Sequence, residues 1–299
     1  MKYNSSAEHY LLIGPYDHIE AQFGVVGLLG NVSDSLDGLE LDPVALLDLT
    51  DLRYQWFDYV FKGAPRPELL KDKVNYEVTG ANFWKHASSL AGMAARSQRF
   101  YLGTEKQDRA YHLSEQSGTR DALVELKVDF ADRSDADGKP VGGSVLDNAI
   151  DARNGIEFIS DPLPHTVEFS GLFSGRLDFS TNKKDFDFQI DLYELTPKGD
   201  YVQLAPYWSR ASYVESRSHR RLLEPGKRQH LDFQSVRLMS RQLQQGSRVV
   251  GVFRVIKESG RQINYGTGKD VSNETIQDSG APLAIKCYAD SYLDLPIGK

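Results

Sequence analysis

Cysteine is nearly absent from the chain, because Cys287 is the only one in 299 residues. A single cysteine excludes an internal disulfide and a cysteine-rich zinc site. Long apolar runs are also lacking, and none approaches the roughly 20 residues that a membrane-spanning helix needs. Residues 1–6 lack the apolar core of a signal peptide. These absences favour the cytoplasm, unless a signal peptide precedes residue 1 in a longer chain.

An excess of positive charge is missing as well. The formal net charge is -7, which argues against bulk electrostatic attraction to nucleic acid or to an anionic membrane. Hydrophobic residues make up 40% and charged residues 26% of the chain, as in an ordinary globular protein. At roughly 150 residues per domain, the length predicts about two domains.

Up to about residue 80, the pattern is strand, helix, strand. Residues 10–13 (YLLI) form a short apolar run, which is typical of a strand buried on both faces of a parallel sheet. Gly14 and Pro15 end this run. Residues 74–79 are predicted to form the next strand.

A helix is predicted between these two strands. Asp42 would be its N-cap, Pro43 its first residue and Gly63 the residue that stops it. An apolar face recurs along it at three- and four-residue spacing: Leu49, Leu52, Trp56 and Val60.

Two strands and one helix are too few to close a hydrophobic core. Further strands would have to come from another segment or from another chain. The chain is then expected to be a fragment of a longer protein, the product of a shortened reading frame, or one half of a split enzyme. Taken alone, it should expose apolar surface around Leu11, Ile13 and Trp56 and self-associate.

From about residue 120 the apolar residues alternate strictly with polar ones, as in half-buried strands. Further strands are predicted at residues 167–173, 230–238, 248–256 and 283–288. Many short strands separated by turns predict a mainly β fold, a jelly-roll β-sandwich. The inward-facing positions are Val124, Leu126, Val128 and Phe130, and then Phe186, Phe188, Ile190 and Leu192.

The acidic residues of one of these strands have two interpretations. Asp185-Phe186-Asp187 contains the D-x-D spacing found in some calcium sites. The alternating pattern explains the same residues as one face of a strand, and it places Asp187 and Asp191 on the solvent side. We favour the second interpretation.

His18 is the candidate catalytic residue. It follows the predicted strand at residues 10–13 by five positions, and catalytic groups gather beyond the carboxyl ends of parallel strands. A histidine there can take a proton from a serine and return it to the leaving group. A plain loop residue is the alternative. Asp17 is not expected to orient His18, because neighbouring side chains usually diverge.

Several segments resemble the X-Pro dipeptidyl-peptidase and cocaine esterase family of serine hydrolases. Residues 12–18 (LIGPYDH) are similar to the G-P-W-x-H segment that carries the family's catalytic histidine, with Tyr16 in place of the usual Trp. The resemblance spans nearly the whole chain in order and spacing. Its other segments are residues 56–63, 74–84, 180–188, 210–213, 222–226, 245–248, 264–268 and 293–297.

The resemblance implies an architecture and an activity. Residues 1–85 would be the terminal strand-helix-strand piece of an α/β-hydrolase core, and residues 86–299 a jelly-roll domain with a galactose-binding-like fold. The activity would be cleavage of an ester, amide or X-Pro dipeptidyl bond through an acyl-serine intermediate, without a metal or organic cofactor. The family's nucleophilic serine and its acid lie before the histidine. They are expected on an upstream segment or a separate chain, so this chain alone is expected to be inactive.

Serines within the chain do not fit the nucleophile's pattern. Ser33 and Ser35 carry no mark of activation, residues 142–144 lack the closing glycine, and residues 171–175 have the wrong spacing. His219 and His230 lack metal-ligand spacing.

A non-catalytic binding module is the alternative function. Tyr207, Trp208 and Tyr213 could stack on a carbohydrate, although packing of these rings within the protein is favoured. A protein partner is the other ligand class for such a module. A local basic cluster is expected to lie on the solvated surface or to pair with carboxylates of the same chain; it comprises Arg217, Arg220, Arg221, Lys227 and Arg228.

Overall fold

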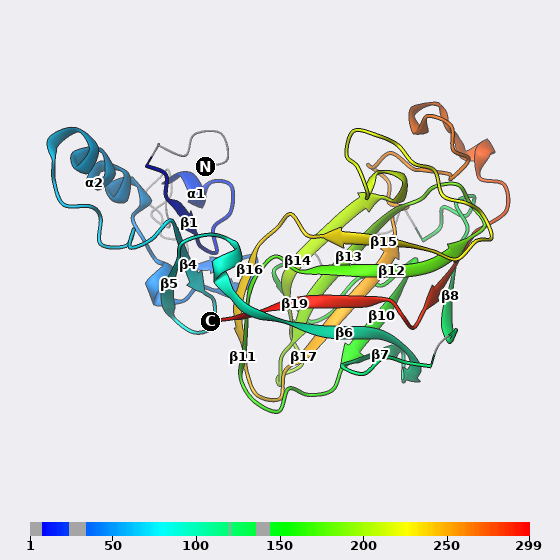
Figure 1. Cartoon of the computed structure of the whole chain (residues 1–299), viewed down its shortest axis with the longest axis horizontal. Coiled ribbons are helices and arrows are strands. Elements are labelled where there is room, and N and C mark those ends of the chain that lie inside the picture. The colour runs from blue at the N-terminus through cyan, green and yellow to red at the C-terminus, as the bar shows by residue number, and fades with distance from the viewer. Residues whose placement is uncertain (1–7, 24–33, 120, 136–143) are drawn as a thin grey trace.

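The computed structural model describes residues 8–23, 34–119, 121–135 and 144–299. Two parts lie side by side along the long axis of the molecule (Figure 1). A three-stranded sheet with a long helix forms the smaller part, and a 14-stranded sheet forms the larger part. The chain is therefore mainly β, as predicted.

The smaller part contains a mixed sheet in the order β1-β4-β5. Its elements are β1 (Leu11–Ile13), α1 (Glu20–Phe23), β2 (Ser35–Leu36), β3 (Leu39–Glu40), the 3₁₀ helix η1 (Pro43–Ala45), α2 (Leu49–Lys62), β4 (Val74–Val78) and β5 (Phe83–Ala87). Strand β1 pairs in parallel with β4, with Ile13 opposite Tyr76, as the apolar run at residues 10–13 predicts.

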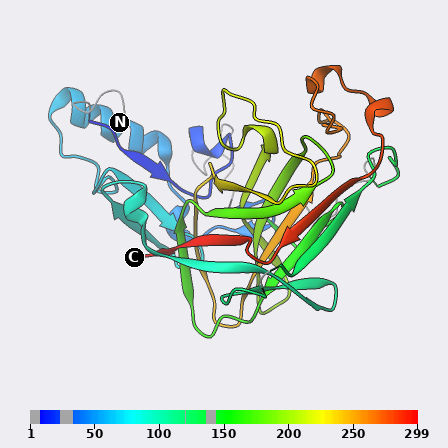
Figure 2. The ribbon, with the colours of Figure 1, turned by 45° about the vertical axis from the view of Figure 1, so that its right-hand side comes forward.

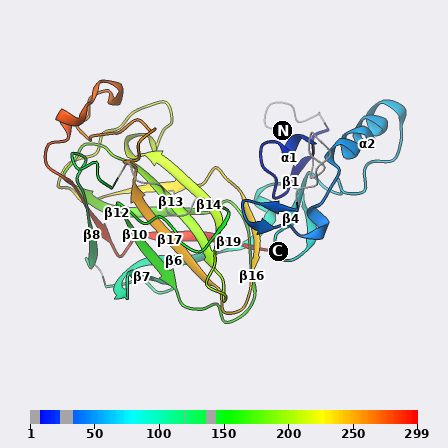
Figure 3. The ribbon, with the colours of Figure 1, turned by 180° about the vertical axis from the view of Figure 1, so that it is seen from behind.

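The larger part is a β-sandwich. In Figure 1, β12, β15 and β19 lie in front of β13, β14 and β17, and the view from behind in Figure 3 reverses this order. Figure 2 shows the two layers more nearly edge-on. The strands are β6 (Ala94–Gln107), β7 (Ala110–Ser114), β8 (Leu123–Val128), β9 (Leu146–Asp147), β10 (Gly155–Ser160), β11 (Val167–Gly171), β12 (Ser174–Thr181), β13 (Asp187–Leu195), β14 (Tyr201–Arg210), β15 (Gln229–Gln234), β16 (Met239–Leu243), β17 (Arg248–Val255), β18 (Leu283–Tyr288) and β19 (Tyr292–Gly298). The 3₁₀ helices η2 (Ala91–Met93), η3 (Ala211–Tyr213), η4 (Val271–Asn273) and η5 (Ile276–Asp278) lie in its connections.

The alternation of apolar residues places the sandwich core correctly. All eight inward-facing positions predicted for β8, β13 and their extensions are buried. Several strands end earlier than predicted, most of all β15, which ends at Gln234 rather than continuing to residue 238.

The prediction that the other face of β13 meets solvent is wrong. Asp191 is only 2% exposed, and its carboxylate lies 3.3 Å from the Arg254 guanidinium. Asp187, half-buried, receives two hydrogen bonds from Arg210 at 2.8 and 3.0 Å. Strand β13 lies between β14 and β17, so charged neighbours cover the face that the sequence pattern assigns to water.

Aromatic rings connect the two layers of the sandwich core. Phe188 is fully buried, and its ring centroid lies 5.8 Å from Phe186, 6.0 Å from Tyr207 and 5.8 Å from Phe253. Tyr207 in turn stacks on Phe233 of β15, with ring centroids 5.0 Å apart. Rings of this size bury much apolar area, which makes the cluster a main source of stability.

The long helix begins later than predicted. Asp48 caps α2, because its carboxylate accepts hydrogen bonds from Thr50 N and Asp51 N at 2.9 Å. Asp42 precedes only the short 3₁₀ helix η1 and makes no side-chain cap there. Its carboxylate instead accepts from Gly80 N and Asn82 N in the turn after β4, at 2.6 and 3.2 Å.

The predicted end of the helix is confirmed. Gly63 adopts a left-handed conformation with φ 71°, which L-residues other than glycine rarely adopt.

Backbone hydrogen bonds join the smaller part to the sandwich. Thr79 N donates to Ser240 O at 3.2 Å, and Gln242 N donates to Thr79 O at 2.9 Å. The Lys85 ammonium adds an ion pair with Glu168 at 2.5 Å. The end of β4 is therefore held against β16.

Truncation of the central ring should destabilise the sandwich. Phe188→Ala is expected to cost about 3–5 kcal/mol, because it leaves a cavity in a fully packed core. Urea unfolding followed by circular dichroism measures the loss. Phe61→Ala in α2 is the matched control and should cost less than about 0.5 kcal/mol, because that ring is exposed. Equal losses in the two variants would contradict this account of the core.

Candidate functional site

His18 lies five residues beyond β1, in the turn that leads into α1, and it is exposed. Among the described residues, none donates a hydrogen bond to its imidazole or accepts one from it. The position is therefore the one predicted, at the carboxyl end of a parallel strand. The catalytic role of His18 stays a prediction.

The Asp17 carboxylate is hydrogen-bonded to the turn before α1 rather than to His18. Its carboxylate accepts hydrogen bonds from Ile19 N and Glu20 N, both at 2.7 Å. The Glu20 carboxylate returns a contact by accepting from Asp17 N at 3.2 Å. This reciprocal cap uses Asp17 to start α1, so it does not orient His18.

Tyr16 fixes the loop that leads to His18. Its ring folds back over Gly14, where there is no room for a Cβ atom. Its hydroxyl donates to Ala45 O at 2.8 Å. The short G-P-Y segment is therefore anchored to η1, and this anchoring limits where His18 can lie.

Where the structure describes the candidate serines, they do not form a catalytic centre. Ser33 and residues 142–143 lie outside the described residues. Ser35 lies in the short strand β2. Residues 171–175 connect two strands of the sandwich. Ser174 belongs to β12, where it pairs with Gln234 of β15 and Asp294 of β19, so this segment is not a nucleophile elbow.

A cavity of about 260 Å³ lies where the β1 loop meets the sandwich. Gly14, Pro15 and Tyr16 form one wall, together with Glu77 and Thr79 at the end of β4. Parts of β14 and β16 form the opposite wall. The parallel register, which pairs Ile13 with Tyr76, brings the end of β4 beside the loop that precedes His18.

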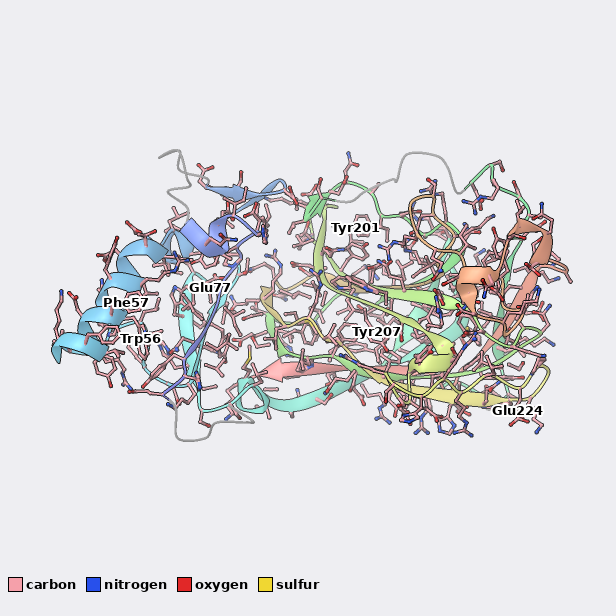
Figure 4. The ribbon with its side chains drawn as sticks, turned by 90° about the horizontal axis from the view of Figure 1, so that it is seen from above. Trp56, Phe57, Glu77, Tyr201, Tyr207 and Glu224 are labelled. Carbon is pink, nitrogen blue, oxygen red and sulfur yellow. The ribbon has the colours of Figure 1, made fainter. Side chains whose placement is uncertain are left out.

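Glu77 is the residue of this cavity that sequence reasoning missed. It is 2% exposed and lies on a strand that is buried at every position. In Figure 4 its side chain lies between α2 and the sandwich. Residues 74–78 (VNYEV) alternate apolar and polar side chains, a pattern that predicts a solvent-facing Glu77, so the burial of this acid is not visible in the sequence.

A second cavity of about 440 Å³ lies between β1 and α2. Tyr10, Leu12, Leu49, Leu52 and Trp56 contribute apolar walls. Within the described residues β1 pairs only with β4, so the other edge of β1 has no partner strand.

The exposed apolar surface of α2 differs from the predicted one. Trp56 is half-buried, with its ring centroid 5.4 Å from Tyr10. The predicted apolar face fails at Val60, which is exposed. Phe57 and Phe61 are exposed and stack on each other at 6.0 Å. Figure 4 shows Trp56 and Phe57 on the end of the molecule away from the sandwich.

The basic cluster is largely paired within the chain, as predicted. Arg228 reaches three carboxylates, those of Asp121, Asp178 and Asp290, at 2.6, 2.9 and 2.6 Å. Arg220 binds the buried Asp185 at 3.0 Å. These ion pairs neutralise arginine charges with carboxylates of the same chain, whose formal net charge is -7.

Asp185 is a structural residue rather than a calcium ligand. Its carboxylate accepts from Ser212 N at 3.0 Å and from Ser212 Oγ at 2.7 Å, in addition to Arg220. In the part of the chain that the structure describes, no group of three or more His, Cys, Asp or Glu residues could hold a metal ion.

The three aromatic residues considered for sugar binding mostly pack within the protein. Tyr207 is buried, and Tyr213 is half-buried in η3. Trp208 is 43% exposed, but the guanidinium groups of Arg237 and Arg261 lie over its ring, 5.1 and 5.8 Å from the centroid. These cations cover ring surface on which a sugar would stack.

None of the described helices is long and apolar enough to cross a membrane.

Three solved structures share the fold. An aminopeptidase from the marine sediment archaeon Thaumarchaeota archaeon has a TM-score of 0.75 at 16% identity, covering 97% of this chain and 49% of its own. An α-amino acid ester hydrolase has a TM-score of 0.73 at 19% identity, with coverage of 96% and 50%. A CocE/NonD family hydrolase from Staphylococcus aureus has a TM-score of 0.62 at 16% identity, with coverage of 98% and 49%. The chain thus spans about half the length of these structures.

Sequence comparison gives the family. No curated protein matches the chain. The family model of the X-Pro dipeptidyl-peptidase C-terminal non-catalytic domain matches residues 66–250, which is more than half of the chain. The chain therefore belongs to the family of the X-Pro dipeptidyl-peptidase C-terminal non-catalytic domain.

Proposed function

We propose that the chain is the C-terminal portion of a serine hydrolase that cleaves ester or amide bonds through an acyl-serine intermediate. The observation that carries the proposal is the parallel strand β1, which has one unpaired edge within the described residues and His18 just beyond its carboxyl end. A parallel strand with one free edge accepts further strands, and its carboxyl end is where catalytic groups collect.

The proposal divides the chain into two domains. Residues 1–85 form the end of an α/β-hydrolase core, and residues 86–299 form a jelly-roll domain that walls the substrate cleft. The upstream core, on the same polypeptide or on a separate one, supplies the serine and the acid. It adds strands to the free edge of β1 and fills the apolar groove between β1 and α2.

In the complete site, His18 acts on protons. It takes the proton of the attacking serine, and the acid of the upstream core stabilises the imidazolium that forms. His18 then gives this proton to the leaving alcohol or amine. A water molecule hydrolyses the acyl-serine in a second step, with His18 again as base.

Two of the structural neighbours suggest a substrate class. They are an aminopeptidase and an α-amino acid ester hydrolase. We propose a small ester, amide or peptide of this kind as the substrate.

Loss of His18 should abolish turnover in the complemented enzyme. The chain is co-expressed with an upstream hydrolase segment that carries the serine and the acid, and p-nitrophenyl ester hydrolysis is measured. His18→Ala is expected to lower kcat by about 10³-fold or more, because the serine loses its base. The control is His219→Ala, an exposed histidine of the sandwich that should leave kcat unchanged. An unchanged rate in His18→Ala would refute the assignment.

The isolated chain should self-associate through α2. Phe57 and Phe61 stack on each other and are exposed, and such a surface is costly to leave in water. Sedimentation velocity is expected to show dimers or larger species, which the double variant Phe57→Glu, Phe61→Glu converts to monomer. Val236→Glu, at an exposed apolar position of the sandwich, should have no effect. A monomeric wild-type chain would contradict the prediction.

A non-catalytic carbohydrate-binding module is the second candidate function, and the exposed Trp208 is the observation in its favour. The two guanidinium groups over its ring argue against stacking on a sugar. The chain is therefore expected to pass through a polysaccharide affinity column without delay. Retention that disappears in Trp208→Ala would reverse this preference.

A further inference from the structure

A third cavity, of about 460 Å³, lies between β14, β15 and the loop that follows η3. The stacked rings of Tyr207 and Phe233 line it, and Trp208 lies beside them. Val214 and the exposed Val236 add aliphatic surface. A cavity of this size with aromatic and aliphatic walls suits a small organic molecule.

Three arginines gather around this cavity. Arg217 lines it. Burial raises the pKa of the Tyr207 hydroxyl, and the positive charge of Arg217 lies near enough to oppose this rise. The guanidinium groups of Arg237 and Arg261 lie over the ring of Trp208, 5.1 and 5.8 Å from its centroid. All three arginines are exposed, so a ligand in the cavity can reach them.

These arginines differ from the others of the sandwich. Every other arginine that the structure describes between residues 94 and 299 donates a hydrogen bond or forms an ion pair within the chain. Arg217, Arg237 and Arg261 do neither among the described residues. Asp232, the acid on the cavity wall, is bonded to Arg176 at 2.6 Å. The positive charge at the cavity is therefore left to an anion from outside.

The chemistry of the three side chains favours a carboxylate. A guanidinium presents its N–H groups as a planar fork that fits the two oxygens of a carboxylate, and it can do so while it lies over an aromatic ring. An inorganic anion would satisfy these donors and leave the apolar walls in contact with water. The walls favour a carboxylate that is attached to an apolar group, above all to an aromatic ring.

We propose that this cavity is a binding site for a small organic carboxylate. Arg217, Arg237 and Arg261 donate hydrogen bonds to its two oxygens, and its apolar part lies against Phe233 and Val236. The guanidinium groups that argue against a neutral sugar on Trp208 are thus the ligand-binding groups of this site. The inference goes beyond the proposed hydrolase function and does not depend on His18 being catalytic.

Calorimetric titration of the full chain with 3-phenylpropionate, at pH 7 and low ionic strength, tests the proposal. Two analogues separate the contributions of charge and of apolar contact. 3-Phenylpropanamide has the same shape without the charge, and acetate has the charge without the ring. Each is expected to bind at least about tenfold more weakly than 3-phenylpropionate. Added salt should also weaken the binding of 3-phenylpropionate, because the arginines are exposed.

Charge-removing variants locate the site. The double variant Arg237→Gln, Arg261→Gln should bind 3-phenylpropionate at least about tenfold more weakly, as expected for lost charge-assisted hydrogen bonds. The matched control is Arg96→Gln, Lys106→Gln, which removes two exposed cations of β6 that do not line the cavity and should bind like the wild type. All four positions are exposed, so circular dichroism should show wild-type unfolding for both variants.

Tryptophan fluorescence gives a second measure of where the ligand binds. Of the chain's three tryptophans, Trp208 lines the cavity. Binding should change the emission, and Trp208→Phe, which keeps an aromatic ring under the arginines, should lose that change. Equal binding of the amide or of acetate, equal affinity in the arginine double variant, or an emission change that persists in Trp208→Phe would overturn the proposal. Failure of 3-phenylpropionate to bind at millimolar concentration would also overturn it.

Discussion

The parallel pairing of β1 with β4 is the constraint on which the smaller part depends. It places the end of β4 beside the loop that leads to His18, and it leaves the other edge of β1 without a partner strand among the described residues. Thr79 then continues from β4 into hydrogen bonds with β16. Strand β4, which contains the buried Glu77, therefore connects the loop before His18 with the sandwich.

Buried charges in the sandwich are matched by partners from distant parts of the chain. Glu194 is buried and receives both the Arg241 guanidinium and the Ser247 hydroxyl, at 2.6 and 2.7 Å. Asp185 is satisfied in the same way by Ser212 and Arg220. Such pairs hold loops and strands in register rather than form a reactive site, because each of these two carboxylates already has its donors.

Patterns that depend on a few neighbouring residues could be read from the sequence. The alternation around Phe188 predicted the sandwich core, and the order of several short segments predicted the family. The patterns failed where distant residues decide the outcome. Asp191 is buried because Arg254 of another strand covers it. The Asp42 carboxylate accepts a hydrogen bond in the turn after β4 instead of capping the predicted helix. Glu77 was missed because only the tertiary structure creates its cavity.

We propose that the chain is the C-terminal portion of a serine hydrolase whose nucleophile lies on an upstream segment or a separate chain. The most direct test is the intact mass of the purified chain before and after treatment with a serine-reactive fluorophosphonate, with an ester-hydrolysis assay alongside. The account predicts no adduct and no turnover. One stoichiometric adduct, with turnover that is lost in His18→Ala, would mean that a serine of this chain is the nucleophile and would contradict the account.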